Sequence, residues 1–162
     1  MPNQYVVGSE DVQIYIKLPD VAAPIKIETG TALNLTYSQN VQEIFAIGSR
    51  PPISLEPINE NYTASLSFQT GEASLLLDAI NGSLPAGTAP YATLSSIPPF
   101  TLSKTMTFKN TLTPKTVTES LLNCIIDNLS SDTNRNDPET LSTISMRGVG
   151  VSRTVAPITA AA

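Results

Sequence analysis

The chain has 162 residues, of which 41% are hydrophobic and only 14% are charged, and its formal net charge is −5. This length suits one domain with a real core, and no cluster of Lys or Arg offers a patch for phosphates, so direct nucleic-acid binding is not expected. The absence of histidine removes the usual general base and the commonest zinc ligand, so the sequence argues against an enzyme.

The cysteine count, the first residues and the lengths of the apolar runs indicate the cellular compartment and the relation to membranes. A single cysteine, Cys124, excludes an internal disulfide, and residues 1–10 lack the pattern of a secretion signal. No apolar run approaches the roughly twenty residues needed to span a bilayer. We expect a soluble chain that matures in a reducing cytoplasm, inserts into no membrane and needs no cofactor.

Three strands are predicted in the first part of the chain, after an arm at residues 1–10. Apolar and polar residues alternate over 12–18, a pattern that predicts a strand ending before Pro19. Two further strands are predicted over 25–28 and 32–38 because they show the same alternation or β-branched character. The first part of the chain is therefore expected to be β.

Residues 41–47 form a segment that is apolar on both sides. In a strand, Ile44 and Ala46 would point one way while Phe45 and Ile47 point the other, so both faces need cover. We interpret the segment as a core strand or a strand at a subunit interface, with one face on the internal core and the other on a helix or a second subunit.

The next stretch predicts a loop followed by a strand. Residues 49–60 contain Pro51, Pro52 and Pro57, which lack an amide donor, so an extended loop is expected rather than a tight hairpin. Apolar residues then alternate with Ser, Thr and Gln over 62–68. This period of two predicts a strand with one buried face.

One short flanking helix is predicted over about Glu72 to Ile80. Thr70 is a suitable cap, Glu72 suits the first turn, and Asn81-Gly82 is a suitable end. Its spacing of apolar residues predicts a stripe that plugs the sheet. The stripe consists of Leu75, Leu76, Ala79 and Ile80.

The second half of the chain is predicted to open with a long loop. Residues 81–99 are rich in Gly, Pro, Ser and Ala without any period, and loops of this length are usually functional or disordered. A strand follows over 101–109, with Lys104 on its otherwise apolar side. Residues 116–129 fit a helix face or a two-sided strand, and the β-branched pair Ile125-Ile126 favours the strand.

The chain is predicted to finish with a strand and an arm. A polar, turn-rich segment after residue 129 fits a hairpin into a strand over 141–152. Residues 153–162 have no period and contain a proline, so they are expected to form a C-terminal arm that is flexible or bound to a partner.

Candidate reactive groups are interpreted as structural. Cys124 lies in an apolar strand and is expected to be a small buried hydrophobe rather than a nucleophile. The neighbouring acids Glu10-Asp11 and Asp137 with Glu139 lie in an arm or loop, where solvated carboxylates are the common case.

Two other motifs are also assigned to packing or loops. Asp132, Asn134 and Asn136 are spaced like the opening of a calcium loop, but Asp137 stands where that loop needs glycine, so a hairpin loop is favoured. Gly148-Val149-Gly150 has too few glycines for a dinucleotide loop. It is expected to let another backbone approach closely.

Several stretches together resemble a known family. At IFAIGSRPPISLEP followed by NYTASLSFQTGE, and at SLLNCIIDNLSSD and LSTISMRGVGV, the sequence resembles tail tube proteins of bacteriophages with contractile tails, over about residues 12–152. The resemblance implies an all-β fold, a small β-sandwich or rolled β-barrel with one flanking helix and long loops, in one domain over residues 1–162. No catalytic residue comes with it.

The resemblance also implies an assembly. Copies would form hexameric rings stacked into a hollow tube for genome delivery, within a virion tail assembled in the host cytoplasm beside sheath, baseplate and tape-measure proteins. DNA would pass an acidic or neutral lumen without specific binding. Residues at a subunit interface would include Ile44, Phe45, Ala46 and Ile47, and the loop at 81–99 would join rings through Asn81, Pro85, Pro90, Tyr91, Pro98 and Pro99.

Two alternatives remain beside this interpretation. A tube-like baseplate or tail-completion protein would share the same strand pattern. A ligand-binding β-sandwich module would fit the strands as well, but such a module would normally show exposed aromatic platforms, and the chain has no Trp.

Overall fold

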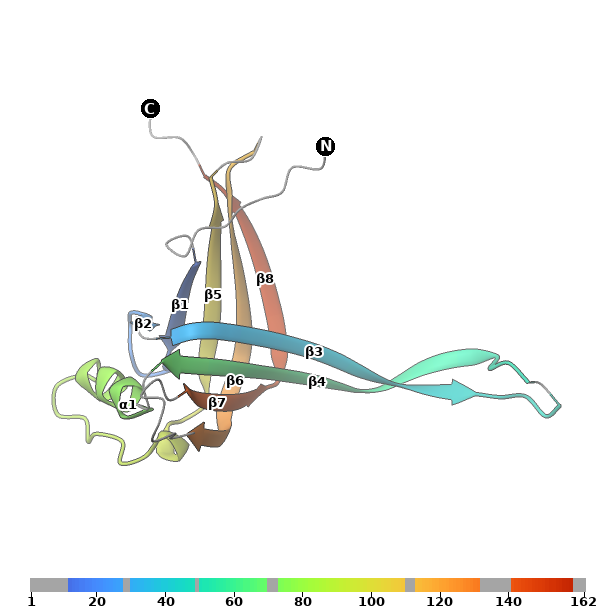
Figure 1. Ribbon diagram of the computed structural model, residues 1–162, viewed down its shortest axis with the longest axis horizontal. Coiled ribbons are helices and arrows are strands. Elements are labelled where there is room, and N and C mark those ends of the chain that lie inside the picture. The colour runs from blue at the N-terminus through green and yellow to red at the C-terminus, as the bar shows by residue number, and fades with distance from the viewer. Residues whose placement is uncertain are drawn as a thin grey trace, which may run out of the picture.

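The computed structural model of the chain describes residues 12–27, 30–48, 50–69, 73–109, 113–131 and 141–158. Within these ranges the protein is mostly β, with one short α-helix (Figure 1). This confirms the predicted all-β class. The elements in chain order are β1 (Val12–Lys17), β2 (Ile25–Ile27), β3 (Gly30–Ile44), β4 (Ser54–Gln69), α1 (Ala73–Gly82), the 3₁₀ turn η2 (Leu94–Ser96), β5 (Phe100–Phe108), β6 (Lys115–Ser131), β7 (Leu141–Gly148) and β8 (Gly150–Pro157).

Several sequence-based assignments fall on residues outside the described ranges. They are the arm at residues 1–10, Asp11, the helix cap Thr70 with Glu72, the calcium-loop positions Asp132, Asn134 and Asn136, and the acids Asp137 and Glu139. These assignments stay predictions.

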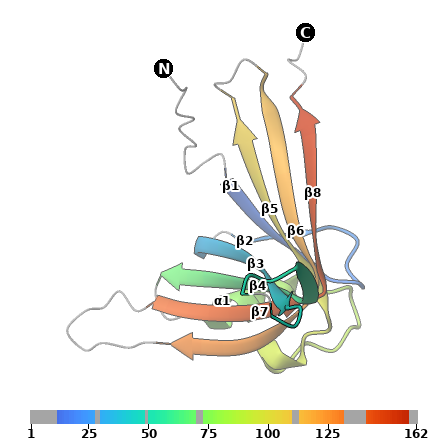
Figure 2. The same ribbon diagram turned by 90° about the vertical axis from the view of Figure 1, so that its right-hand side faces the viewer.

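The antiparallel strands pair in the order β2-β1-β5-β6-β7-β4-β3, and β8 pairs with β6 beside that path. Strand β6 belongs to two layers. Its first part, Lys115–Cys124, pairs with β5 and β8, and its second part, Ile125–Ser131, pairs with β7. We call the layer β2-β1-β5-β6-β8 sheet A and the layer β6-β7-β4-β3 sheet B. In Figures 1 and 2 the strands of sheet A rise above the strands of sheet B, which run across beneath them.

A kink in β6 allows one strand to serve both layers. Asn123 has φ 47°, a left-handed conformation that Asn tolerates better than most residues. At this point four residues of β6, Leu121 to Cys124, stand opposite three residues of β5, Phe100 to Leu102, so the strand contains a bulge. The bulge changes the strand direction between sheets A and B.

The last two strands, β7 and β8, meet beside the kink in β6. One strand was predicted over 141–152, but β7 and β8 are separated at Val149, whose amide donates to the Leu122 carbonyl at 3.0 Å. A Cβ added at Gly148 would lie 2.9 Å from the Leu122 carbonyl oxygen, so another backbone approaches closely there, as the glycine motif predicted. The predicted C-terminal arm is wrong for residues 153–157, because their backbone pairs with β6 along the edge of sheet A.

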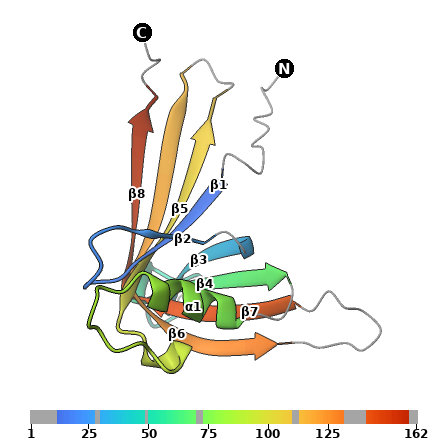
Figure 3. The same ribbon diagram turned by 90° about the vertical axis from the view of Figure 1, so that its left-hand side faces the viewer.

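The core lies between the two sheets and α1. The prediction for residues 62–68 is confirmed at Ala64 and Leu66, which are buried on the same side of β4. Figure 3 shows α1 in front of sheet B, where Leu76 and Ile80 are buried in the core. Ala79 is exposed, contrary to the prediction, so the buried stripe of α1 is narrower than expected.

The loop after α1 contributes to the core, which its composition did not indicate. Leu94 in η2 and Ile97 just after it are buried among the core residues, and Leu84 and Tyr91 pack against them. Two hydrogen bonds also fix the loop to α1: the Asn81 side chain donates to the Tyr91 carbonyl at 3.0 Å and accepts from the Tyr91 amide at 2.8 Å. The segment is therefore a structural part of the body.

The single cysteine behaves as predicted. Cys124 is fully buried, and its thiol donates to the Phe100 carbonyl at 3.0 Å. Burial raises the pKa of this thiol to about 11. At pH 8 its thiolate is therefore roughly a hundredfold scarcer than that of an ordinary thiol.

We accordingly expect Cys124 to resist thiol reagents in the folded protein. A maleimide at pH 8 should react at least about a hundredfold more slowly with the native chain than with the chain in concentrated urea, because both access and thiolate are lost. Mass spectrometry of timed samples measures the two rates. Equal rates in the two solutions would contradict the buried position.

Candidate assembly surfaces

One face of sheet A carries uncharged hydroxyl side chains in aligned rows. Leu102, Val117 and Leu121 alternate with these residues and are buried, so the rows point away from the core. Neighbouring hydroxyls bond across the strands: Ser103 to Ser120 at 2.9 Å and Thr105 to Thr118 at 3.3 Å. We call this the hydroxyl face; it consists of Ser103, Thr105, Thr107, Thr116, Thr118, Ser120, Ser152 and Thr154.

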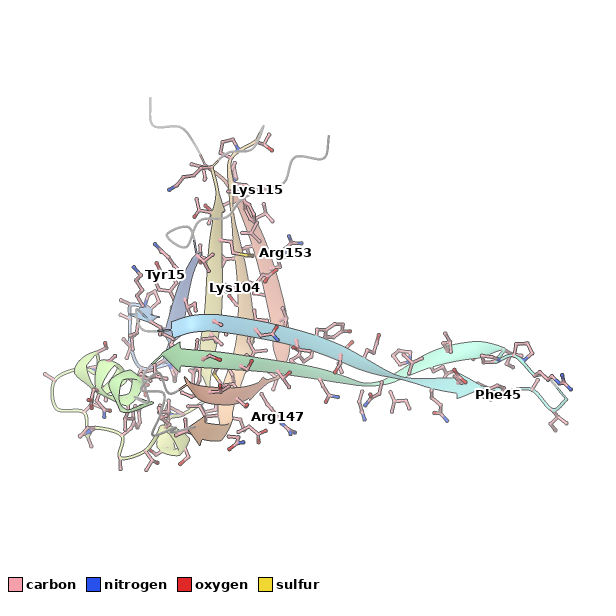
Figure 4. All side chains as sticks on the ribbon, viewed as in Figure 1. Tyr15, Phe45, Lys104, Lys115, Arg147 and Arg153 are labelled. Carbon is pink, nitrogen blue, oxygen red and sulfur yellow. The ribbon has the colours of Figure 1, made fainter. Side chains whose placement is uncertain are left out.

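The opposite face of sheet A holds a row of three charges just beyond the core. The Lys104 ammonium lies 3.2 Å from one Glu119 oxygen, and the Arg153 Nε lies 3.8 Å from the other. These residues are register partners on β5, β6 and β8. Lys104 and Arg153 are labelled in Figure 4. Lys104 therefore lies on the apolar side of its strand, as predicted, and its charge is balanced by Glu119.

Sheet A has open edges among the described residues. β8 pairs only with β6, and β2 covers only Ile14–Ile16 of β1, so Val12 and Gln13 have no strand partner on that side. Because neighbouring strands are antiparallel throughout, β1 and β8 run in opposite directions. An edge of this kind offers free N–H and C=O groups to another strand.

Strands β3 and β4 continue past the body as a projecting arm, plainly visible at the right of Figure 1. The extended loop predicted over 49–60 is wrong from Ser54 onward, because those residues pair with β3 as a hairpin. Pro57 is accommodated beside a bulge, where Ile58 has no opposite residue. Only the segment before Ser54 turns outside the strands.

Residues 41–47 lie on this arm and not in the core. Phe45, labelled near the tip in Figure 4, is exposed, as are Ala46 and Ile47, while Ile44 is half-buried. The core-strand interpretation is therefore wrong, since none of these four side chains is buried. A strand with one face on the core would make one of the variants Ile44→Glu and Phe45→Glu unfold the subunit, whereas the exposed arm predicts that both leave it folded. The role of these residues at an interface stays a prediction.

A tyrosine pair marks the root of the arm. The rings of Tyr37 and Tyr62 lie 5.2 Å apart between centroids with planes at 34°. Both hydroxyls donate to the Glu60 carboxylate, the Tyr37 hydroxyl at 3.5 Å. The hydrogen bond to Glu60, aided by burial and by the carboxylate charge, raises the pKa of Tyr62 to about 12. The phenol of Tyr62 therefore stays neutral where an ordinary tyrosine ionises.

The six loop residues expected to join rings differ in their exposure to solvent. Pro85, Pro90 and Pro99 are exposed, whereas Asn81, Tyr91 and Pro98 are half-buried. The first three could reach another subunit, while Asn81 and Tyr91 are engaged with each other inside this chain. Their part in ring stacking stays a prediction.

The described residues include a polar hollow but no cluster of metal ligands. They contain no group of three His, Cys, Asp or Glu side chains placed to hold a metal ion. A polar hollow at the root of the arm is lined mainly by Ser38, Asn61, Thr63 and Arg147, and the Arg147 Nε is already paired with Asp127 at 2.9 Å. Among the described residues, no helix has the length and apolar character that crossing a membrane requires.

Comparison with solved structures finds the same fold in tail tube proteins. No protein-family model and no curated protein sequence matches the chain. Among solved structures, the SPP1 tail tube has a TM-score of 0.57 at 11% identity, with 91% of this chain and 78% of that chain covered. A chain of the anti-feeding prophage baseplate has a TM-score of 0.56 at 11% identity, with 95% and 97% covered.

A third solved structure extends the comparison to contractile systems. A chain of the PVC sheath-tube complex, from an extracellular contractile injection system, has a TM-score of 0.55 at 12% identity, with 95% of each chain covered. The resemblance to tail tube proteins found in the sequence is thus confirmed for the fold. The chain has the tail-tube-like fold shared by phage and contractile injection system proteins.

Proposed function

We propose that the chain is the structural subunit of a phage tail tube, in which hexameric rings stack into a hollow conduit for genome delivery. The observation that carries the proposal is the combination of the tail-tube-like fold with open edges on both sides of sheet A. Pairing β8 of one copy with the uncovered start of β1 in the next copy, at Val12 and Gln13, would continue the antiparallel pattern and shorten the open edges. The function is structural and needs no catalytic residue.

The hydroxyl face supplies the lining of the conduit in this proposal. Its rows carry no charged side chain, so they neither hold phosphates by counterion release nor repel them strongly. DNA would therefore slide past without specific binding. The lining is neutral rather than acidic. Lys17 lies at the kink end of β1, and Lys109 directly follows β5 at the other end of the rows.

The partners follow from the same assembly. Sheath, baseplate and tape-measure proteins would contact such a tube, and its place would be the virion tail. A tube-like baseplate or tail-completion subunit is a second candidate, favoured by the matches to chains of the anti-feeding prophage baseplate, TM-score 0.56, and of its tube-terminating cap, TM-score 0.52.

Negative-stain microscopy of the purified chain, followed by cysteine labelling, tests the proposal. Thr118→Cys places a thiol on the hydroxyl face, and Ser145→Cys places one on the outer side of sheet B, between buried Ile144 and Met146. The native Cys124 provides little background because it is buried. In tubes, a small maleimide should label both variants.

A maleimide attached to a polymer that is too bulky to enter the lumen distinguishes the hydroxyl face from the outer side of sheet B. It should label Ser145→Cys in tubes but leave Thr118→Cys unmodified until the tubes are dissociated. Equal labelling of both variants in intact tubes would show that the hydroxyl face does not line the lumen. Solid aggregates or a chain that never forms hollow rings would overturn the tube proposal itself.

A further inference from the structure

The end of α1 contains the only Asn-Gly pair in the sequence, Asn81-Gly82. In an Asn-Gly pair the asparagine side chain reacts readily with the next backbone nitrogen, because glycine has no Cβ to hinder the approach and adopts conformations that other residues avoid. The pair stands where the segment of residues 83–99 leaves the helix. It is therefore a candidate site of chemical modification as well as a helix end.

The side-chain amide of Asn81 is held at both of its ends by the backbone of one residue in that segment. Its oxygen accepts from the Tyr91 amide at 2.8 Å, and its nitrogen donates to the Tyr91 carbonyl at 3.0 Å. We call these two hydrogen bonds the Asn81 clamp. Figures 1 and 3 show that the segment after α1 turns away from the helix and returns beneath it to η2. The clamp therefore joins the end of the helix to the returning part of the segment.

The backbone on both sides of the pair is fixed as well. Gly82 is the last residue of α1, so its amide points into the helix toward an earlier carbonyl. The Leu84 amide donates to the Asn81 carbonyl at 3.3 Å. For the reaction, the Gly82 nitrogen must reach the side-chain carbonyl carbon of Asn81. The Asn81 backbone must then leave its helical conformation and its side chain must leave Tyr91, and the folded chain opposes both movements.

We propose that Asn81-Gly82 is a latent self-modification site that the Asn81 clamp keeps inactive in the folded protein. The Gly82 nitrogen forms a bond to the side-chain carbonyl carbon of Asn81, and the side-chain nitrogen leaves as ammonia together with the proton of the Gly82 amide. This step gives a five-membered succinimide. One water molecule then opens the ring at either carbonyl and leaves aspartate or isoaspartate at position 81. The whole reaction takes up one water and releases one ammonia, with no oxidation or reduction.

Neither product restores the clamp. A carboxylate has acceptor oxygens and no donor, so the oxygen that replaces the Asn81 nitrogen faces the Tyr91 carbonyl, which lies 3.0 Å from that nitrogen in the native chain. Isoaspartate also lengthens the backbone by one carbon, which breaks the helical geometry at the end of α1. The reaction therefore loosens the attachment of the segment that places Leu94 and Ile97 in the core. Local opening permits the reaction, and the reaction makes the opening permanent.

The first test compares the reaction in folded and unfolded chains. Peptide mass spectrometry of samples incubated at pH 8 follows the conversion of Asn81. The folded chain should react at least about tenfold more slowly than the chain in concentrated urea, because the hydrogen bonds of the clamp must open first. Equal rates in the two solutions would overturn the proposal.

Gly82→Ala is the matched control for this comparison. An added Cβ at Gly82 would meet nothing within 4 Å, and alanine favours a helix more than glycine does, so the variant should fold like the wild type. In urea its Asn81 should react at least about tenfold more slowly than that of the wild type, because the added Cβ hinders the attacking nitrogen. A reaction as fast as in the wild type would exclude attack by the backbone nitrogen of residue 82.

Two substitutions at Tyr91 separate the clamp from the packing of the tyrosine ring. Tyr91→Ala removes the side chain and keeps the amide donor, whereas Tyr91→Pro removes the donor as well. Asn81 should react about fivefold faster in Tyr91→Pro than in Tyr91→Ala, as expected for the loss of one hydrogen bond. A second measurement needs no substitution. In the wild type at rising urea concentrations below unfolding, hydrogen exchange of the Tyr91 amide and the reaction at Asn81 should accelerate in parallel, since both require the same opening.

Asn81→Asp reproduces the aspartate product directly. It should lower the melting temperature by roughly 4–8 °C, because an unsatisfied carbonyl then faces a carboxylate. Hydrogen exchange in residues 91–97 should also become faster. Ala79→Asp is the control, since it adds the same charge on the exposed side of α1 without touching the clamp. Its exchange in residues 91–97 should stay close to that of the wild type.

The remaining outcomes divide the proposal into its two parts. If Tyr91 exchange and the reaction at Asn81 respond differently to urea, the clamp does not control the site and the proposal is lost. If Asn81→Asp keeps the wild-type melting temperature and exchange, the product does not release the segment and that part is lost. All of these measurements are made on the unassembled chain, so they neither support nor contradict the tube function.

Discussion

Gly148→Ala is expected to lower the free energy of unfolding by about 3 kcal/mol, a large part of the roughly 5–15 kcal/mol typical of a domain. An added Cβ would lie 2.6 Å from Leu121 Cγ, 2.7 Å from Leu121 Cδ1 and 2.9 Å from the Leu122 carbonyl oxygen. Leu121 is fully buried, and the carbonyl belongs to the backbone of the kink, where Leu122 accepts the Val149 amide. Neither neighbour can move without disturbing the junction of the two sheets.

Gly150→Ala provides the matched control for this substitution. An added Cβ there would meet only Leu122 Cδ1, at 3.8 Å, which is an ordinary van der Waals distance. Urea denaturation followed by circular dichroism should give a free energy of unfolding near that of the wild type for Gly150→Ala and a much lower one for Gly148→Ala. Similar losses in both variants would show that glycine is needed for backbone freedom rather than for close packing.

Leu94→Ala and Ile97→Ala are each expected to cost about 2–5 kcal/mol, so the double variant should be close to unfolded at room temperature. Leu94 is 8% exposed and Ile97 7% exposed, and both belong to the core although they lie in an apparently featureless loop. Truncating either side chain leaves a cavity that the short η2 turn cannot readily close. Thermal melts of the single and double variants measure the loss.

The same reasoning reverses an expectation drawn from the sequence for the loop. From the sequence alone, residues 81–99 form an aperiodic loop that adds little to a core, so their replacement by a short Gly/Ser turn is expected to leave the fold intact. The replacement should instead unfold the domain, since it removes Leu94, Ile97 and the Asn81 contacts with Tyr91. Pro90→Ala, an exposed change in the same loop, is the control and should leave the melting temperature nearly unchanged.

The sequence by itself determined the strands whose patterns follow from one buried face. Ile14 and Ile16 in β1, and Ala64 and Leu66 in β4, alternate with polar residues and are buried as predicted. Alternation is a local consequence of the pleat, so it can be read without knowing which strands pair. The buried, inert Cys124 and the short helix were likewise predicted from local character.

Only the tertiary structure decided where two-sided or patternless segments lie. Residues 41–47 could be assigned to a core as readily as to an interface, because periodicity does not say what covers a face. Long-range pairing with β3 made a strand of the proline-containing Ser54–Asn59 segment, and pairing with β6 made a strand of residues 153–157. Leu94 and Ile97 are buried because α1 and β6 fix the position of their loop, and that contact depends on residues distant in the sequence.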